Sequence, residues 1–413
     1  MEDGIHRDVL DLDEFDFTKL DFTHPNASFK ENAVQFINMD YSNKTFRITE
    51  DFIKQCMQNI KNNGLLIDDD ESAKIEVNFK NCKFSNLIIK EQNIKADILF
   101  DYDEKFKNLK IAKFIIFGSK LSGKFYVNKQ YSGNNQTLVI DSFKIENTIF
   151  EENFKLHHAE LSEFNVEDTD FNKHSDFFKS KFSKGILTED KAEKINNGDI
   201  GFKAINFKGL ALFGDTEFSK KLIFKYVTFE SFSHFRKAKL FEGLDLDYSN
   251  IQNEMNFFDV EKLDSSKAKN NTSQETFRII KHNFNKIGNV IEANKYHSLE
   301  LKKRRNQLKI FSTDFFNYLV FFFHWISSNH SKNWILPILW ILAIGFLTYS
   351  TLDNFVCARY GCTNNLIDVF KYMSIVNYDD CIKKNPIIFI LNKVLLGYFY
   401  YQFITSIRKD TRK

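Results

Sequence analysis

The chain has 413 residues and a formal net charge of +2, from 57 basic and 55 acidic residues. A chain of this length has one to three domains and buries a sizeable core, and its balanced charge gives no reason to expect a general nucleic-acid-binding protein. Phe is abundant (47) and Pro is scarce (3), while the spacing of the five Cys matches no zinc-binding pattern.

The first segment, residues 1–74, is expected to be an acidic N-terminal region with a short helix that caps the following domain. Its first residues are acidic and contain no apolar run, which predicts that there is no signal peptide and that the N-terminal body is cytoplasmic. Apolar residues from Phe52 to Ile60 recur at spacings of three to four. We therefore expect a helix over 49–62, with Thr49 as its N-cap.

Residues 75–255 carry a large apolar residue at about every fifth position, often with a small residue two positions earlier. This period fits neither an α-helix nor a simple strand, and it predicts a solenoid in which each short unit forms one corner of a coil. A small inward residue beside a large one suits the narrow interior of such a coil. The predicted core of the repeats comprises Phe79, Phe84, Ile89, Phe171, Phe177, Phe182, Phe213, Phe218, Phe235 and Leu240.

This double periodicity resembles the pentapeptide-repeat family, whose loose motif is small–polar–Leu/Phe–variable–variable. The resemblance covers residues 75–255 and is interrupted near 127–140 and 184–200. It implies a mainly β fold, a right-handed quadrilateral β-helix; a conventional Phe-rich β-sandwich is the alternative. Some members of that family imitate DNA and act on topoisomerases, which needs a strongly acidic surface. The nearly equal numbers of basic and acidic residues in these repeats argue against that activity and against nucleic-acid binding here.

The composition and the periodicity of the sequence change after the repeats. Residues 256–273 are polar and are expected to form a linker. Residues 274–309 show apolar residues at helical spacing with a break at Gly288, which predicts a helical hairpin. We expect this hairpin to cover the open end of the coil, because the last strand edges would otherwise be unpaired.

Residues 333–413 are expected to form a two-span membrane domain. Trp334 to Leu352 is an uncharged run long enough to cross a bilayer, and Pro386 to Ile407 is a second candidate span. Basic residues are more frequent outside the two spans than in the loop between them, which predicts that both termini are cytoplasmic. Together with the resemblance to the pentapeptide-repeat family, this implies the inner (cytoplasmic) membrane of a bacterium as the expected location, in a multi-pass arrangement.

The aromatic segment before the first span, residues 310–332, follows a run of four basic residues at 302–305. We interpret it as an amphipathic helix that lies in the cytoplasmic interface, where basic residues favour anionic lipids. A third span is the alternative.

Polar residues stand out within the membrane domain. Lys393 lies about seven residues, or about 10 Å, into the second span, where a charged side chain is by default a functional hypothesis and snorkelling to the outer interface is the alternative. Gln402 is placed to form hydrogen bonds across helices in an oligomer. Three Cys lie in the external loop, where a disulfide is permitted, and the spacing leaves two pairings equally open: Cys357–Cys362 and Cys362–Cys381.

No catalytic, cofactor or metal site is predicted. Residues 118–124 match the start of a phosphate-binding loop, but Phe125 stands where Ser or Thr is needed and the segment lies inside the repeats. Two histidine pairs lack further ligands at a supporting spacing: His157 with His158, and His324 with His330.

The two spans and their loop also resemble the pore module of a simple cation channel, because the loop contains an apolar stretch from Leu366 to Met373. The loop has no filter-like sequence, and its one glycine, Gly361, precedes that stretch, which argues against selective conduction.

Our leading hypothesis is a non-enzymatic membrane scaffold that presents a cytoplasmic repeat domain to a protein partner, without cofactors. The alternative is an oligomeric membrane pore or channel-like effector that is regulated by the coil. An enzyme would require residues that these patterns do not contain.

Overall fold

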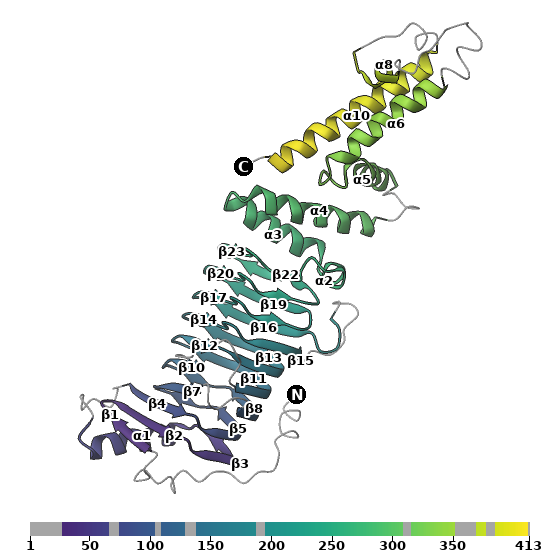
Figure 1. The fold of residues 1–413 in the computed structure, drawn as a ribbon. Coiled ribbons are helices and arrows are strands. Elements are labelled where there is room, and N and C mark those ends of the chain that lie inside the picture. The colour runs from purple at the N-terminus through teal and green to yellow at the C-terminus, as the bar shows by residue number, and fades with distance from the viewer. Residues whose placement is uncertain are drawn as a thin grey trace. The chain divides into compact units, whose positions relative to one another are not determined.

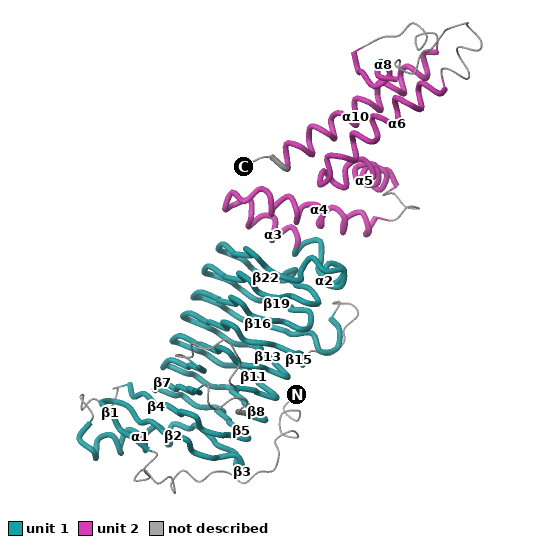
Figure 2. The backbone as a smooth tube through the Cα atoms, viewed as in Figure 1, with its two compact units in different colours: residues 1–276 teal, residues 277–413 magenta. Residues whose placement is uncertain are grey.

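The computed structural model describes residues 27–65, 74–103, 109–128, 138–186, 195–308, 315–351, 369–376 and 385–411. These residues belong to two compact units, residues 1–276 and 277–413 (Figures 1 and 2). The first unit is built from parallel β-strands and two short helical segments. The second unit is helical.

The strands of the first unit form two sheets (Figure 1). One sheet contains, in spatial order, β1 (Ala27–Lys30), β2 (Ala33–Ile37), β4 (Ile75–Lys80), β7 (Ala96–Asp101), β10 (Phe125–Val127), β12 (Phe154–Leu156), β14 (Ser175–Asp176), β17 (Ala211–Leu212), β20 (Ser233–His234) and β23 (Met255–Asn256). The other contains β3 (Asp40–Arg47), β5 (Lys83–Lys90), β6 (Asn93–Ile94), β8 (Leu109–Phe117), β9 (Lys120–Leu121), β11 (Leu138–Phe150), β13 (Ala159–Phe171), β15 (Lys181–Gly185), β16 (Ile200–Phe207), β18 (Glu217–Phe218), β19 (Leu222–Phe229), β21 (Lys239–Leu240) and β22 (Leu244–Ile251).

Along the chain, successive coils add strands to both sheets. Each strand therefore lies beside the equivalent strand of the next coil. Among the described strands, all pairings between coils are parallel, and only β1 and β2 pair antiparallel. This arrangement is consistent with a solenoid, in which a chain of short coils buries one continuous core.

The register of the strands gives the length of a coil. Leu161 pairs with Phe182, Phe182 with Phe218, and Phe218 with Leu240. Equivalent positions therefore recur 21 or 22 residues apart, and 36 apart where a longer segment separates β15 from β16. Four units of five residues account for most of each coil, so the period read from the sequence corresponds to about a quarter of a coil.

Left-handed backbone conformations recur at equivalent positions of the coils, while the spacing of the inward residues is not strictly five. Lys179 (φ 54°) lies between the inward residues Phe177 and Phe182, which are five positions apart. The step from Phe171 to Phe177 is six positions long and contains no residue with positive φ. Residues with positive φ recur on successive coils at Asn147, Asp168, Ala204 and Tyr226, and at His158, Lys179, Asp215, Lys237 and Asp259.

Phenylalanine rings form ladders along the interior of the coils. Phe177, Phe213, Phe235 and Phe257 stack in sequence with centroid separations of 5.0, 4.8 and 5.3 Å and interplanar angles of 1°, 15° and 13°. These separations match the spacing of hydrogen-bonded strands, because each ring sits on the equivalent ring of the next coil. All ten residues assigned to the repeat core are buried, with at most 1% of their surface exposed. The small residues Ser175, Ala211 and Ser233 are also buried and lie one above the other.

The first coils are covered by helix α1 (Glu50–Asn62), which confirms the helix expected over 49–62. The Thr49 side chain accepts a hydrogen bond from the backbone NH of Phe52 at 3.1 Å, as an N-cap does. The buried face of α1 places Phe52 against the rings of Phe36, Phe46 and Phe79 at 5.6–6.3 Å.

The coils extend beyond the range in which the five-residue pattern is visible. Strands β2 and β3 pair with β4 and β5, so stacking begins well before residue 75. At the other end, Phe257 continues a ring ladder and α2 (Ser266–Asn271) follows it, where a linker over 256–273 was expected. Strand pairing needs only backbone groups, and a single inward ring extends the core, so neither feature requires a complete sequence repeat.

The second unit contains α3 (Gln274–Lys286, whose first turn belongs to the first unit), α4 (Val290–Gln307), α5 (Phe315–Ser328), α6 (Ile335–Thr351), α8 (Val369–Met373) and α10 (Pro386–Thr411). Helices α3 and α4 are separated near Gly288 (φ 75°), as the sequence predicts, and Tyr296 stacks on Phe284 at 5.6 Å. Helices α6 and α10 pack through Ile341, Ile344, Leu396 and Phe399.

Candidate functional site

Helix α10 buries three polar residues beside the apolar Leu396 and Phe399. Asn392, Gln402 and Ser406 are each at most 4% exposed, although the helix is apolar in overall composition. The exposed side consists of large apolar residues, namely Ile387, Ile390, Leu391, Val394, Leu395, Tyr401 and Ile404. Among the described helices, α10 is the one that is long and apolar enough to cross a membrane, over Pro386–Lys409. Helix α6, with 17 residues, is shorter.

Side chains of α10 bind three consecutive carbonyl groups at the C-terminal end of α8. The hydrogen bonds run from Asn392 Nδ2 to Tyr372 O (3.1 Å), from Tyr400 OH to Met373 O (3.1 Å), and from Lys393 Nζ to Ser374 O (2.7 Å). The last carbonyls of a helix have no partner within the helix, so they are suitable acceptors for these three side-chain donors. A lysine ammonium is also attracted to the negative end of a helix dipole.

The seam between α6, α8 and α10 is closely packed around these bonds. Asn392 Nδ2 also donates to Thr348 Oγ1 on α6 at 2.9 Å. A Cβ atom built at Gly345 would lie 2.5 Å from Met373 Cγ, so α8 approaches α6 closely here and a larger residue would require the Met373 side chain to shift. Lys393, which the sequence singles out, is therefore part of a polar seam that holds α8 against α6 and α10.

Gln402 has a hydrogen-bond partner within its own chain. Its Oε1 accepts from Ser328 Oγ at 3.0 Å, and the neighbouring Ser327 Oγ lies 3.2 Å from Tyr398 OH. Both serines lie at the end of α5, and Trp340 Nε1 of α6 donates to the Ile326 carbonyl at 3.0 Å. The end of α5 is thus fixed to α6 and α10 by polar contacts.

Sequence reasoning missed Asn392 and Tyr400 as members of this seam. Asn392 adjoins Lys393 and lies on the same helical face as Gln402. This spacing in the sequence could have identified Asn392 as a buried polar residue. Nothing in the sequence shows that Tyr400 reaches a carbonyl of α8. The three cysteines proposed for a disulfide, Cys357, Cys362 and Cys381, lie outside the described residues. Cys56 and Cys82 are buried free thiols, and burial raises the pKa of Cys82 to about 12.

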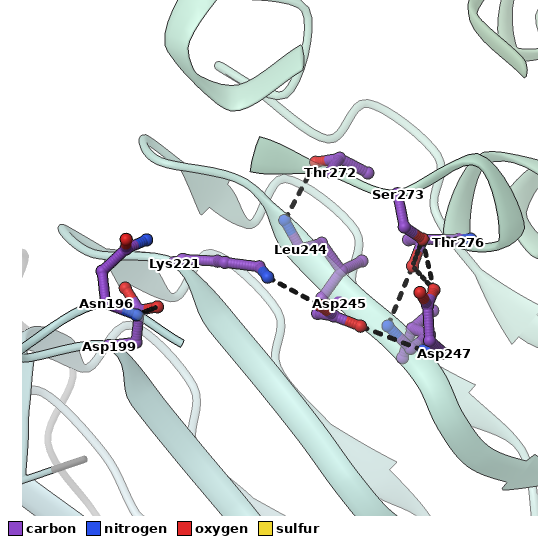
Figure 3. Close-up of polar contacts among 10 residues, drawn as sticks. Asn196, Asp199, Lys221, Leu244, Asp245, Asp247, Thr272, Ser273 and Thr276 are labelled. Carbon is purple, nitrogen blue, oxygen red and sulfur yellow. Dashed lines mark hydrogen bonds and ion pairs between the residues drawn. The ribbon is translucent and has the colours of Figure 1, made fainter. Parts of the chain in front are cut away.

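Charged residues are also buried at the C-terminal end of the first unit (Figure 3). The Lys221 side chain is 3% exposed, and its Nζ lies 2.6 Å from Asp245 Oδ2. Asp199 is buried beside them and accepts a hydrogen bond from the Asn196 backbone NH at 2.8 Å. Burial raises the pKa of Asp199, against the opposing effects of the Asn196 hydrogen bond and the Lys221 charge. A buried charge needs a partner of this kind to be tolerated.

Two threonines cover backbone groups of the last long strand in the same region (Figure 3). Thr272 Oγ1 accepts from the Leu244 NH at 3.1 Å, and Thr276 Oγ1 accepts from the Leu246 NH at 2.9 Å. These contacts satisfy strand-edge donors of β22, so α2 and the first turn of α3 protect this edge of the first unit.

The segment that matches a phosphate-binding loop is part of the coil. Gly123 faces the backbone of the neighbouring strand, because a Cβ atom there would lie 2.0 Å from the Ala96 carbonyl oxygen. Lys120 pairs with Glu151 at 2.7 Å and Lys124 with Asp97 at 3.3 Å. Its glycine and lysines thus serve packing and ion pairing between coils.

The histidine pairs have separate surroundings. His157 Nε2 lies 2.9 Å from Asp176 Oδ2, whereas burial lowers the pKa of His158 to about 4. His324 Nδ1 lies 3.2 Å from His330 Nδ1. Within the described ranges, no group of three or more His, Cys, Asp or Glu is arranged to hold a metal ion.

Comparison of the chain with protein-family models, with curated proteins and with solved structures finds no match.

Proposed function

We propose that this protein is a non-enzymatic scaffold of the cytoplasmic membrane, which presents its parallel-β unit to a protein partner. The observation that carries the membrane part of the proposal is the arrangement of α10, with polar residues inside and large apolar residues outside. In water this arrangement is unfavourable, because exposed apolar surface is hydrated and buried polar groups lose their solvent. In a bilayer the exposed apolar surface contacts acyl chains, and the buried side is the place where polar groups find partners within the protein.

The free energy of transferring the exposed apolar side chains of α10 from water into lipid favours membrane insertion. Full burial of an aliphatic side chain contributes roughly 1.5–3 kcal/mol, and six side chains on α10 would each gain about half of that on transfer from water, because about half of each is exposed: Ile387, Ile390, Leu391, Val394, Leu395 and Ile404. Helix α6 supports a second span, because Leu339, Leu342, Phe346 and Leu347 are exposed on it while Gly345 and Thr348 are buried. In the two-span arrangement that we propose, basic residues flank both outer ends and both termini are cytoplasmic.

We further propose that the first unit is a right-handed quadrilateral β-helix of the pentapeptide-repeat type. The inward small–large pairs support this, since Ser175 with Phe177 and Ala211 with Phe213 are buried in equivalent positions of successive coils. Strands as long as β13, which pairs with β15 and then with β16, cover more than one side of a coil. A scaffold role suits a long stack of coils, because it offers a wide and rigid surface.

Membrane attachment is tested by fractionation. The full chain is expected to remain with membranes after alkaline carbonate extraction, whereas deletion of residues 311–413 should release the remainder into the soluble fraction. Val394→Asp should lower the carbonate-resistant fraction, because an acidic residue near the middle of a span costs about 2.5–3.5 kcal/mol. Ile149→Asp, at an exposed position of β11, is the matched control and should have no effect. Membrane retention of the truncated chain would overturn the proposal.

The alternative function is an oligomeric pore or channel-like effector. The packing of α8 against α6 and α10 is the observation that favours it, because two spans with a short helix between them form a pore module in simple channels. Its weakness is that the terminal carbonyls of α8 are bound by α10 side chains. A subunit count in nanodiscs separates the two functions, since a monomer excludes the pore. Conductance of reconstituted protein that changes in Lys393→Leu would instead support it.

A further inference from the structure

Five basic side chains converge in the second unit, where the ends of α4, α5 and α10 meet. They are Arg305 and His297 of α4, His324 of α5, His330 of the turn after α5, and Lys409 of α10. Two contacts join these elements: Asn294 Nδ2 of α4 donates to the Lys409 carbonyl at 2.9 Å, and the Arg305 guanidinium lies 4.3 Å from the ring centroid of Trp325 on α5.

The main electrostatic influences on His330 come from basic groups. Burial, followed by repulsion from His324, Arg305, His297 and Lys409, lowers the pKa of His330 to about 3. The charges that act most strongly on His330 are basic. Glu300, the acidic residue nearest in sequence to Arg305, lies 2.7 Å from Lys281, 3.1 Å from Arg278 and 3.4 Å from His297 Nδ1, so its charge is shared among three basic side chains.

Two buried nitrogen atoms in the cluster have no hydrogen-bond partner among the residues that the structure describes. They are Arg305 Nη1 and His330 Nε2, and the whole of His330 is 3% exposed. Buried polar groups in native proteins are nearly always satisfied, so an exception of this kind needs an explanation. An anion that accepts from both nitrogens would supply the missing partner and offset the excess of positive charge.

The hydrogen bonds around His330 support a donor at its Nε2. Ser331 Oγ lies 3.2 Å from His324 Nε2, and His324 Nδ1 lies 3.2 Å from His330 Nδ1. If the serine hydroxyl donates to His324, the proton of His324 is on Nδ1 and is donated to His330. His330 is then protonated at Nε2, with a free N–H group. An anion at this nitrogen would select this tautomer over the reverse one.

We propose that this cluster binds the phosphate group of an anionic phospholipid. Arg305 would supply a planar guanidinium, which suits phosphate oxygens, and His330 would supply the second donor. The neighbouring helix α5 exposes Phe316, Val320 and Phe323, as a helix in contact with acyl chains does. The lipid source of the phosphate rests on the membrane location proposed above, whereas the affinity of the cluster for phosphate does not.

The test uses the full chain in nanodiscs of phosphatidylcholine with an increasing fraction of phosphatidylglycerol, and native mass spectrometry to count retained phosphatidylglycerol. Loss of one charge-assisted hydrogen bond lowers affinity roughly tenfold or more, so Arg305→Gln and His330→Gln should both lose lipid to that extent. Arg304→Gln, an exposed neighbour with the same change of charge, is the matched control and should stay within about twofold. Arg305→Lys keeps the positive charge but lacks the planar guanidinium group, so this variant should bind phosphatidylglycerol with intermediate affinity.

Equal loss in Arg304→Gln and Arg305→Gln would overturn the proposal, since it would indicate general attraction to an anionic surface. Unchanged retention in both Arg305→Gln and His330→Gln would also overturn it. Titration of the detergent-solubilised chain with inorganic phosphate separates the sources: competition with the lipid supports a phosphate site, and phosphate binding without lipid retention overturns the lipid assignment. A chain that carbonate extracts from membranes but that still binds phosphate would refute the membrane function alone.

Discussion

Removal of one ring from the phenylalanine ladders tests whether the first unit behaves as a stack of coils. Phe213 is fully buried and stacks on Phe177 at 5.0 Å and on Phe235 at 4.8 Å. Replacement of a buried Phe by Ala typically costs about 3–5 kcal/mol, from lost burial and from the cavity that remains. We expect Phe213→Ala to be at the upper end, because its neighbours are held by strand pairing on both sides and cannot collapse into the space.

The effect should also be local. In a solenoid each repeat contacts only its neighbours, so lost packing energy opens adjacent coils and leaves distant ones protected. Hydrogen–deuterium exchange of the full chain, read by mass spectrometry, should show exchange faster by at least about a hundredfold in peptides from β16, β17, β19 and β20, since about 1.4 kcal/mol corresponds to tenfold. Peptides from β4 and β7 should be unchanged. Phe241→Ala, at a partly exposed position, is the control and should have a much smaller effect. An equal loss of protection in β4 and β17 would refute the reasoning, because it would indicate a single cooperative core.

Three further changes have defined outcomes. Gly123→Ala should disrupt the coil and lower the thermal midpoint, since its Cβ would overlap a backbone oxygen at 2.0 Å, whereas Gly397→Ala, with no atom within 4 Å, should be neutral. Asn392→Leu should lower the free energy that holds α8 against α6 and α10 by about 0.6–1.7 kcal/mol. Proteolysis near α8 should then be faster. An unchanged cleavage rate would contradict the assigned hydrogen bonds. Burial would raise the pKa of Glu300, but hydrogen bonds from His297, Lys281 and Arg278 outweigh it and lower it to about 2. Because this folded-state pKa is depressed, the stabilisation is present above about pH 4.5 and is lost as the pH falls towards 2. The thermal midpoint should follow that dependence, and Glu300→Gln should remove it.

The interior of the first unit was largely predictable from sequence, whereas its limits were not. Residues such as Phe177 and Phe213 recur with a period that no helix or strand produces, and the structure buries them in equivalent places. Strands β2 and β3 carry little of that pattern and join the stack through backbone pairing. The α3–α4 hairpin was predictable because its stripe of apolar residues and its glycine are local signals.

The polar contacts of the second unit, in contrast, could not be predicted from the sequence. Lys393 and Gln402 stood out because polar residues are rare in an apolar run, but their partners, Ser374 and Ser328, come from other helices. Arg305 was one of four similar basic residues in sequence, and its burial against Trp325 distinguishes it from Arg304.

The sequence by itself determined the features that depend on periodic burial: the stacked coils with their ring ladders, the first helix and its cap, and the apolar helix α10. These follow from local spacing, since side-chain direction repeats with the backbone. Only the tertiary structure decided which polar groups meet: the donors on the α8 carbonyls and the cluster around His330. The physical reason is that hydrogen bonds and charge interactions act over a few ångströms, between residues such as Asn294 and Lys409 that folding alone brings together.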